Sequence, residues 1–174
     1  MSATKYDLVI VGGGLVGGSL ACALAGAGLS VALIEALPQA IRNQASYDER
    51  VLALSWGSRR ILEAMGLWAD LAPGAEPISQ VQVSDRGRFG FARLDSAEEG
   101  VPALGYVVPA RLIGQAIQAR LGGIDLFCPA RLVGFRCQED RVDVEVTTAG
   151  QSRLLTAALL VAADGGDSAI CRPM

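Results

Sequence analysis

Residues 6–35 contain a strand, a glycine-rich turn, a helix and a second strand that ends in an acid. This order constrains the fold more than any other feature of the chain. Leu8 to Val11 form a short apolar run of the kind expected for a strand buried on both faces. The run stops at three glycines with the spacing G-x-G-x-x-G, namely Gly12, Gly14 and Gly17. The pattern predicts a strand–helix–strand unit of an α/β fold.

Each glycine of this turn has a physical reason. Gly12 permits the tight turn, Gly14 lets a pyrophosphate approach the backbone, and Gly17 lets the helix pack closely on the strand. A helix from about 15 to 27 points free N–H groups at the phosphates. Glu35, at the end of the second strand, can accept both ribose hydroxyls. The combination predicts a dinucleotide site; the alternative is a glycine-rich turn without a ligand, which requires neither the helix nor the acid.

Composition indicates one α/β domain. The chain has 174 residues, of which 51% are hydrophobic and 19% charged, with a net charge of −3. This charge argues against a nucleic-acid surface, which requires clustered Lys and Arg. No apolar run approaches the roughly 18–20 residues that span a bilayer, and the first strand begins too early to leave room for a signal peptide. We therefore expect a cytoplasmic protein that does not bind nucleic acid.

The chain has no histidine, and its four cysteines form no C-x-x-C pair. The absence of histidine excludes Ser-His-Asp and Cys-His catalysis and removes the commonest metal ligand. Scattered cysteines are typical of reduced, buried thiols. We therefore predict no metal site and no catalytic side chain, and expect a bound cofactor to supply any chemistry.

Hydrophobic periodicity predicts further strands and helices along the chain. We expect helices at 55–66 and 110–121, and strands at 78–85, 104–108, 124–127, 132–137, 142–147 and 159–163. The last strand runs into Asp164 and Gly165, which places a carboxylate and an open backbone where α/β sheets bind ligands. Because Asp-Gly is also a common turn pair, an ordinary strand-to-loop turn is the alternative.

Three segments together resemble the FAD-dependent aromatic hydroxylases, which are class A flavoprotein monooxygenases. They are residues 11–18 with Glu35, residues 48–55 with 57–68, and residues 161–168. The second segment and residues 104–108 look specifically like the hydroxylases of ubiquinone biosynthesis, which oxidise a polyprenylated phenol ring. The resemblance extends along the whole chain with the order of the motifs preserved.

The resemblance implies roles for individual residues, with FAD as cofactor and NAD(P)H as co-substrate. Gly12, Gly14 and Gly17 would line the FAD pyrophosphate, and Glu35 would hold the adenosine ribose. Five further residues have implied roles. Arg50 and Ala53 would lie against the flavin, the backbone of Leu132 would meet the adenine, and Asp164 and Gly165 would lie between FAD and the nicotinamide donor. For Arg50, which follows two acids, a solvated surface charge is the alternative.

The implied fold is a Rossmann-like FAD-binding fold with an inserted β-rich portion of a substrate domain. The FAD-binding segments would be about 1–75, 105–140 and 155–174, and the substrate-sheet portion about 76–104. Members of this class are much longer, so the chain would be the N-terminal part of the domain, truncated, with the C-terminal half absent. Two departures are Pro109, where the family often has Arg or Gln nearby, and Arg172, which stands one position late.

The resemblance implies hydroxylation of an aromatic ring in ubiquinone biosynthesis, with NAD(P)H and O₂. The substrate would be a small aromatic molecule with a lipid tail, so peripheral contact with the inner face of the membrane is a further implication. Two alternatives share the N-terminal motif. One is another FAD oxidoreductase, of the prenyl reductase or amine oxidase type; the other is a non-catalytic nucleotide-binding fragment. The sequence leaves the ring position, the choice between NADH and NADPH, and the oligomeric state open.

Overall fold

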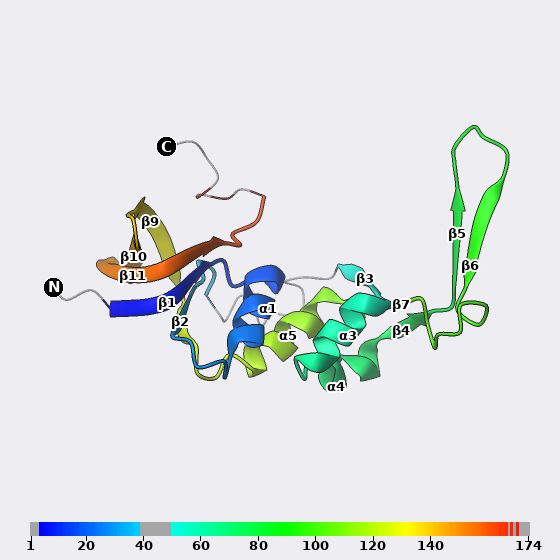
Figure 1. Ribbon diagram of the computed structural model, residues 1–174, viewed down its shortest axis with the longest axis horizontal. Helices are drawn as coiled ribbons and strands as arrows, with labels where there is room; N and C mark the ends of the chain where they lie inside the picture. Colours follow the sequence, from blue (N-terminus) through cyan, green and yellow to red (C-terminus); the bar gives the residue numbers. More distant parts are fainter. Residues whose placement is uncertain (1–3, 39–49, 167, 169, 171–174) are drawn as a thin grey trace. The chain divides into compact units, whose positions relative to one another are not determined.

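The computed structural model describes residues 4–38, 50–166, 168 and 170. The chain divides into two compact units, residues 1–47 with 117–174 and residues 48–116. Figure 1 labels most of the helices and strands of both units. The predicted division into FAD-binding and substrate-sheet segments is a functional one, and it stays a prediction.

The first unit is built on a six-stranded sheet with the order β8-β2-β1-β11-β10-β9. β8, β2, β1 and β11 run parallel, whereas β10 and β9 are antiparallel to their neighbours. The mixed α/β arrangement with a parallel sheet confirms the predicted fold class. The strands are β1 (Thr4–Val11), β2 (Val31–Ile34), β8 (Asp125–Phe127), β9 (Ala130–Cys137), β10 (Val142–Thr148) and β11 (Gln151–Ala162).

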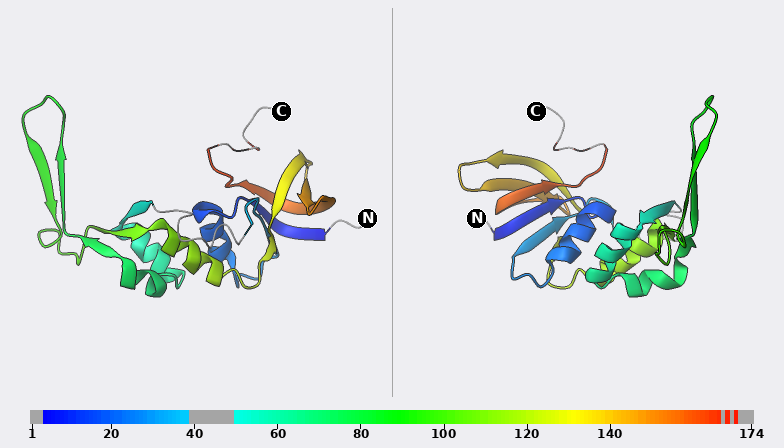
Figure 2. Two further views of the ribbon diagram at one scale, coloured as in Figure 1. Left: turned by 180° about the vertical axis from the view of Figure 1, so that it is seen from behind. Right: turned by 45° about the vertical axis from the view of Figure 1, so that its right-hand side comes forward.

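The centre of this sheet is fully buried, as the apolar run predicts. Val9, Ile10 and Leu33 have no exposed surface, and complete burial of such a side chain contributes about 1.5–3 kcal/mol. α1 (Leu15–Leu24) packs against β1 and β2 (Figures 1 and 2). The core on the strands extends through β9, β10 and β11, so the antiparallel strands belong to the same packed unit.

Two element boundaries differ from the sequence-based expectation by three residues or more. α1 ends at Leu24 rather than near residue 27, because Ala25 is extended and Gly26 takes a φ of 83°. β11 begins eight residues before the predicted 159, since its polar start pairs with β10 as a hairpin strand. Residues 155–157 of β11 pair with both β10 and β1. The apolar run therefore marked only the half of β11 that continues into the parallel sheet.

The second unit contains a three-stranded antiparallel sheet with the order β3-β7-β4 and a separate β5-β6 hairpin. The predicted helix at 55–66 is present, and the side chain of Ser55 caps its first turn by accepting a hydrogen bond from the backbone N–H of Ser58 (3.1 Å). The elements are β3 (Val51–Ser55), α3 (Trp56–Ala64), α4 (Trp68–Leu71), η1 (Ala72–Gly74), β4 (Glu76–Ile78), β5 (Gln80–Ser84), β6 (Phe91–Asp95), β7 (Gly105–Pro109) and α5 (Ala110–Ala119), within which the unit boundary falls.

Arg59 joins the two helices that follow β3. Its guanidinium lies 4.9 Å from the ring centre of Trp56 and 5.3 Å from that of Trp68. It also forms a bidentate ion pair with Glu63 (2.7 and 2.8 Å). Such a planar cation can stack on aromatic rings and pair with a carboxylate at once. The contact fixes α3 to α4 inside the second unit. Among the described residues, no helix is long and apolar enough to span a membrane.

A buried tyrosine in the first unit predicts a loss of stability at high pH. The Tyr6 hydroxyl donates a hydrogen bond to Asp125 (2.8 Å), and burial, followed by this bond and the charge of Asp125, raises the pKa of Tyr6 to about 12. The folded state therefore holds the proton more tightly than the unfolded state, whose tyrosine has a pKa near 10. Stability from Tyr6 should be complete below pH ~10 and lost as the pH rises towards ~12.

Thermal unfolding measured between pH 9 and 12 tests this expectation, with Tyr6→Phe as the matched variant. The melting temperature of the unmodified chain should fall more steeply with pH than that of the variant, because only the former must release the buried proton. Identical slopes would show that Tyr6 has no part in the alkaline unfolding.

Candidate functional site

The carboxyl ends of β2, β1 and β11 meet at one edge of the six-stranded sheet. Val11 is in register with Ile34 on one side and with Ala162 on the other. Beyond this register the backbone N–H of Gly12 donates to Ile34 (2.8 Å), and that of Ala163 donates to Val11 (2.8 Å). The parallel register thus brings the glycine turn, the acid after β2 and the Asp-Gly pair after β11 to the same edge, where open α/β sheets bind ligands.

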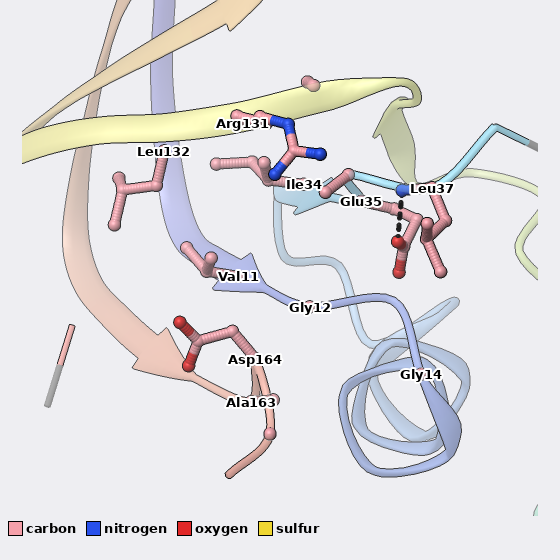
Figure 3. Close-up of a pocket in the computed structure, with 13 residues that line it drawn as sticks. Val11, Gly12, Gly14, Ile34, Glu35, Leu37, Arg131, Leu132, Ala163 and Asp164 are labelled. Atoms are coloured by element: carbon pink, nitrogen blue, oxygen red, sulfur yellow. Dashed lines mark hydrogen bonds between the residues drawn. The ribbon is translucent and has the colours of Figure 1, made fainter. Parts of the chain in front are cut away.

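A cavity of about 450 Å³ lies at this edge (Figure 3). Six of the nine predicted site residues line it: Gly12, Gly14, Glu35, Leu132, Asp164 and Gly165. Gly17 lies in α1 and does not line the cavity. Arg50 and Ala53 belong to the second unit, where both are exposed. The structure therefore brings together four residues predicted for the adenosine and pyrophosphate of FAD with Asp164 and Gly165, which were predicted to lie between FAD and the nicotinamide donor.

Gly12 allows the turn after β1 to lie close to the segment that follows β11. It has a φ of 101°, which side chains rarely permit. A Cβ atom here would collide with the carbonyl oxygen of Ala163 and approach the Cα of Asp164 to 2.8 Å. Any other residue would push the Asp164 segment away from the turn.

Gly14 and Gly17 differ in what a side chain would meet. Gly14 is the N-cap residue of α1, and a Cβ atom on it would have no atom within 4 Å. That space belongs to the cavity, and no side chain caps the first turn of α1, so its N–H groups can receive an anion. A Cβ atom on Gly17 would instead collide with the carbonyl oxygen of Gly12. The middle glycine keeps ligand space open, whereas the third permits packing.

Glu35 holds the turn from the other side of the cavity. The residue is 8% exposed, and its carboxylate accepts hydrogen bonds from the backbone N–H groups of Gly13 (2.8 Å) and Leu37 (2.7 Å). Figure 3 shows the carboxylate beside Leu37, with the turn of Gly12 and Gly14 below it. Glu35 therefore organises the turn, a role that the sequence motif did not indicate.

The strand β9 lines the cavity beside the glycine turn and Glu35. The backbone N–H of Ala130 donates to the Glu35 carbonyl oxygen (2.8 Å), which fixes the start of β9 beside the acid. Leu132 lines the cavity, as predicted, and Arg131 lines it as well. We did not predict Arg131, because only the register of β9 places it here, and no local motif marks that register.

Asp164 lies on the opposite side of the cavity from Glu35. It is half-buried, and in Figure 3 its carboxylate points towards Val11 and Leu132. Gly165 follows with a φ of 85°, which allows the chain to turn directly after the strand. The cavity therefore carries two carboxylates, from Glu35 and Asp164, and the N-terminus of α1.

Residues 5–173 match the family model described as FAD binding domain. The chain belongs to this family. FAD is accordingly its cofactor. The open space at Gly14 together with the uncapped N-terminus of α1 fits a pyrophosphate such as that of FAD.

Named relatives carry the comparison further. The ubiquinone hydroxylase UbiL of Rhodospirillum rubrum is 40% identical over 167 residues, covering 94% of this chain and 38% of that protein. The 3-demethoxyubiquinol 3-hydroxylase of Escherichia coli is 30% identical over 175 residues, covering 98% of this chain and 44% of that protein. The solved anhydrotetracycline hydroxylase OxyS of Streptomyces rimosus has a TM-score of 0.78 at 24% identity, covering 95% of this chain and 33% of that one.

The chain therefore spans less than half the length of these relatives. The similarity confirms the resemblance to the hydroxylases of ubiquinone biosynthesis. The contacts with FAD predicted for individual residues all stay predictions; they concern Gly12, Gly14, Gly17, Glu35, Arg50, Ala53, Leu132, Asp164 and Gly165.

Proposed function

We propose that this chain is the FAD-binding portion of a monooxygenase that hydroxylates the aromatic ring of a ubiquinone precursor with NAD(P)H and O₂. The observation that carries the proposal is the cavity at the carboxyl edge of the sheet. It combines the glycine turn, the uncapped helix and Glu35, in a chain similar along nearly its whole length to ubiquinone hydroxylases.

The residues of the chain act by binding and orienting the cofactor. The first turn of α1 holds the pyrophosphate, Glu35 holds the ribose, and Asp164 organises the turn at Gly165 beside them. FAD, when bound, supplies the hydride-accepting and oxygen-activating chemistry that the side chains of this histidine-free chain lack. No side chain of the cavity is assigned as a catalytic acid or base.

The substrate in this proposal is a small aromatic molecule with a lipid tail. In this proposal the protein is cytoplasmic. Because such a substrate resides in a membrane, the protein would contact the membrane surface peripherally. The acidic net charge of −3 is consistent with a protein that has no nucleic-acid partner.

The test is the consumption of NAD(P)H by the full-length gene product in the presence of a polyprenylated phenol. We expect the phenol to stimulate an O₂-dependent consumption of NAD(P)H, and label from isotopic O₂ to appear on the ring of the product. Reduction of the prenyl chain, or oxidation of an amine without ring labelling, would assign another FAD oxidoreductase. ADP binding without a flavin spectrum would assign a nucleotide-binding module.

A further inference from the structure

Arg131 is the single basic side chain among the described residues that line the cavity. It is exposed on β9, and Figure 3 shows its side chain pointing from β9 towards the end of β2, where Ile34 and Glu35 lie. Within the described part of the chain its guanidinium forms no hydrogen bond and no ion pair. A cation with five donors thus faces ligand space without an internal partner.

The order of groups along the cavity indicates which part of a ligand Arg131 meets. The pyrophosphate belongs at the N-terminus of α1, and the ribose belongs at Glu35. The base therefore lies on the side of Glu35 away from α1. β9 begins on that side, since Ala130 is bonded to the Glu35 carbonyl oxygen, and Arg131 is the next residue.

We propose that the guanidinium of Arg131 stacks on the adenine ring and thereby contributes to selection of the adenosine portion of FAD. The inference rests on the FAD-binding function proposed above. A planar guanidinium can lie flat on an aromatic ring, whereas the compact ammonium of lysine cannot reproduce this contact. The competing role is charge pairing with a phosphate, which lysine would preserve and which salt would screen.

Calorimetric titration of the chain with ADP separates these roles, because ADP carries the base, ribose and pyrophosphate without the flavin. Arg131→Ala should weaken ADP binding about 5- to 30-fold. Arg131→Lys should lose most of the same affinity, and both losses should be equal at low and high NaCl concentrations. Arg136→Ala is the matched control, because Arg136 is exposed on the same strand and does not line the cavity.

The possible outcomes distinguish this inference from the proposed function. If Arg131→Ala binds ADP as tightly as the unmodified chain does, the role of Arg131 is wrong, whereas the proposed nucleotide site is unaffected. Recovery of affinity in Arg131→Lys, or a loss that disappears at high salt, would overturn stacking in favour of phosphate pairing. Failure of the unmodified, folded chain to bind ADP would overturn the nucleotide site and this inference together.

Discussion

Replacing Gly17 by alanine is expected to lower the free energy of unfolding by about 3 kcal/mol, as for other overpacked sites. The added Cβ atom would collide with the carbonyl oxygen of Gly12 and come within 3.1 Å of Ala163 and Ile10. Backbone on one side and a buried strand on the other leave no flexible group to yield. Alanine in a helix gains at most about 1 kcal/mol over glycine, so the collision should prevail.

Differential scanning calorimetry measures the effect, which corresponds to a fall in Tm of about 6–12 °C for a chain of this length. Gly134→Ala is the matched control, because Gly134 lies on β9 and a Cβ atom there would meet nothing within 4 Å. A Gly17→Ala variant as stable as this control would show that the helix can move off the turn without cost.

Gly14→Ala separates folding from binding in the same turn. Its Cβ atom would enter open cavity space, so stability should stay unchanged while ADP affinity falls. The opposite behaviour of two glycines three residues apart follows from their surroundings, one facing the ligand and the other facing the carbonyl of Gly12.

The sequence was informative wherever the signal was local. The strand, glycine turn, helix and acid of residues 6–35 are contiguous, so their periodicity and spacing predicted the α/β class and placed the glycine turn and Glu35 at one site, where they line the cavity. The apolar run before Asp164 likewise predicted a strand that delivers an acid to a sheet edge. Its place beside β1 follows from the parallel register, which brings together segments distant in the chain.

Features that depend on pairing between distant segments could not be predicted from the sequence. The start of β11 is polar and exposed, because its neighbour there is β10 in a hairpin, so no apolar run marked it. Arg131 reaches the cavity because Ala130 is bonded to Glu35, a contact between residues far apart in sequence. The bonds of Glu35 to Gly13 and Leu37 also follow from the folded turn rather than from the motif.

Replacing Glu35 by glutamine is expected to weaken ADP binding about 10- to 100-fold, the range for loss of a hydrogen bond to a charged group. Glutamine keeps the length of the side chain but has one oxygen, so it cannot accept from both Gly13 and Leu37. Its NH₂ group would face one of these N–H donors. If this donor is the buried N–H of Gly13, its loss of an acceptor should also cost about 1–3 kcal/mol of stability.

A second ligand distinguishes direct recognition of the ribose from mere support of the turn. The carboxylate of Glu35 repels a phosphate on the ribose 2′-oxygen, so the unmodified chain should prefer ADP over adenosine 2′,5′-bisphosphate. Removal of the charge in Glu35→Gln should narrow this preference while weakening ADP binding. If Glu35 only supports the turn, the variant should lose affinity for both nucleotides by the same factor. Calorimetric titration with the two ligands therefore decides whether Glu35, which accepts a hydrogen bond from Gly13, also binds the ribose directly.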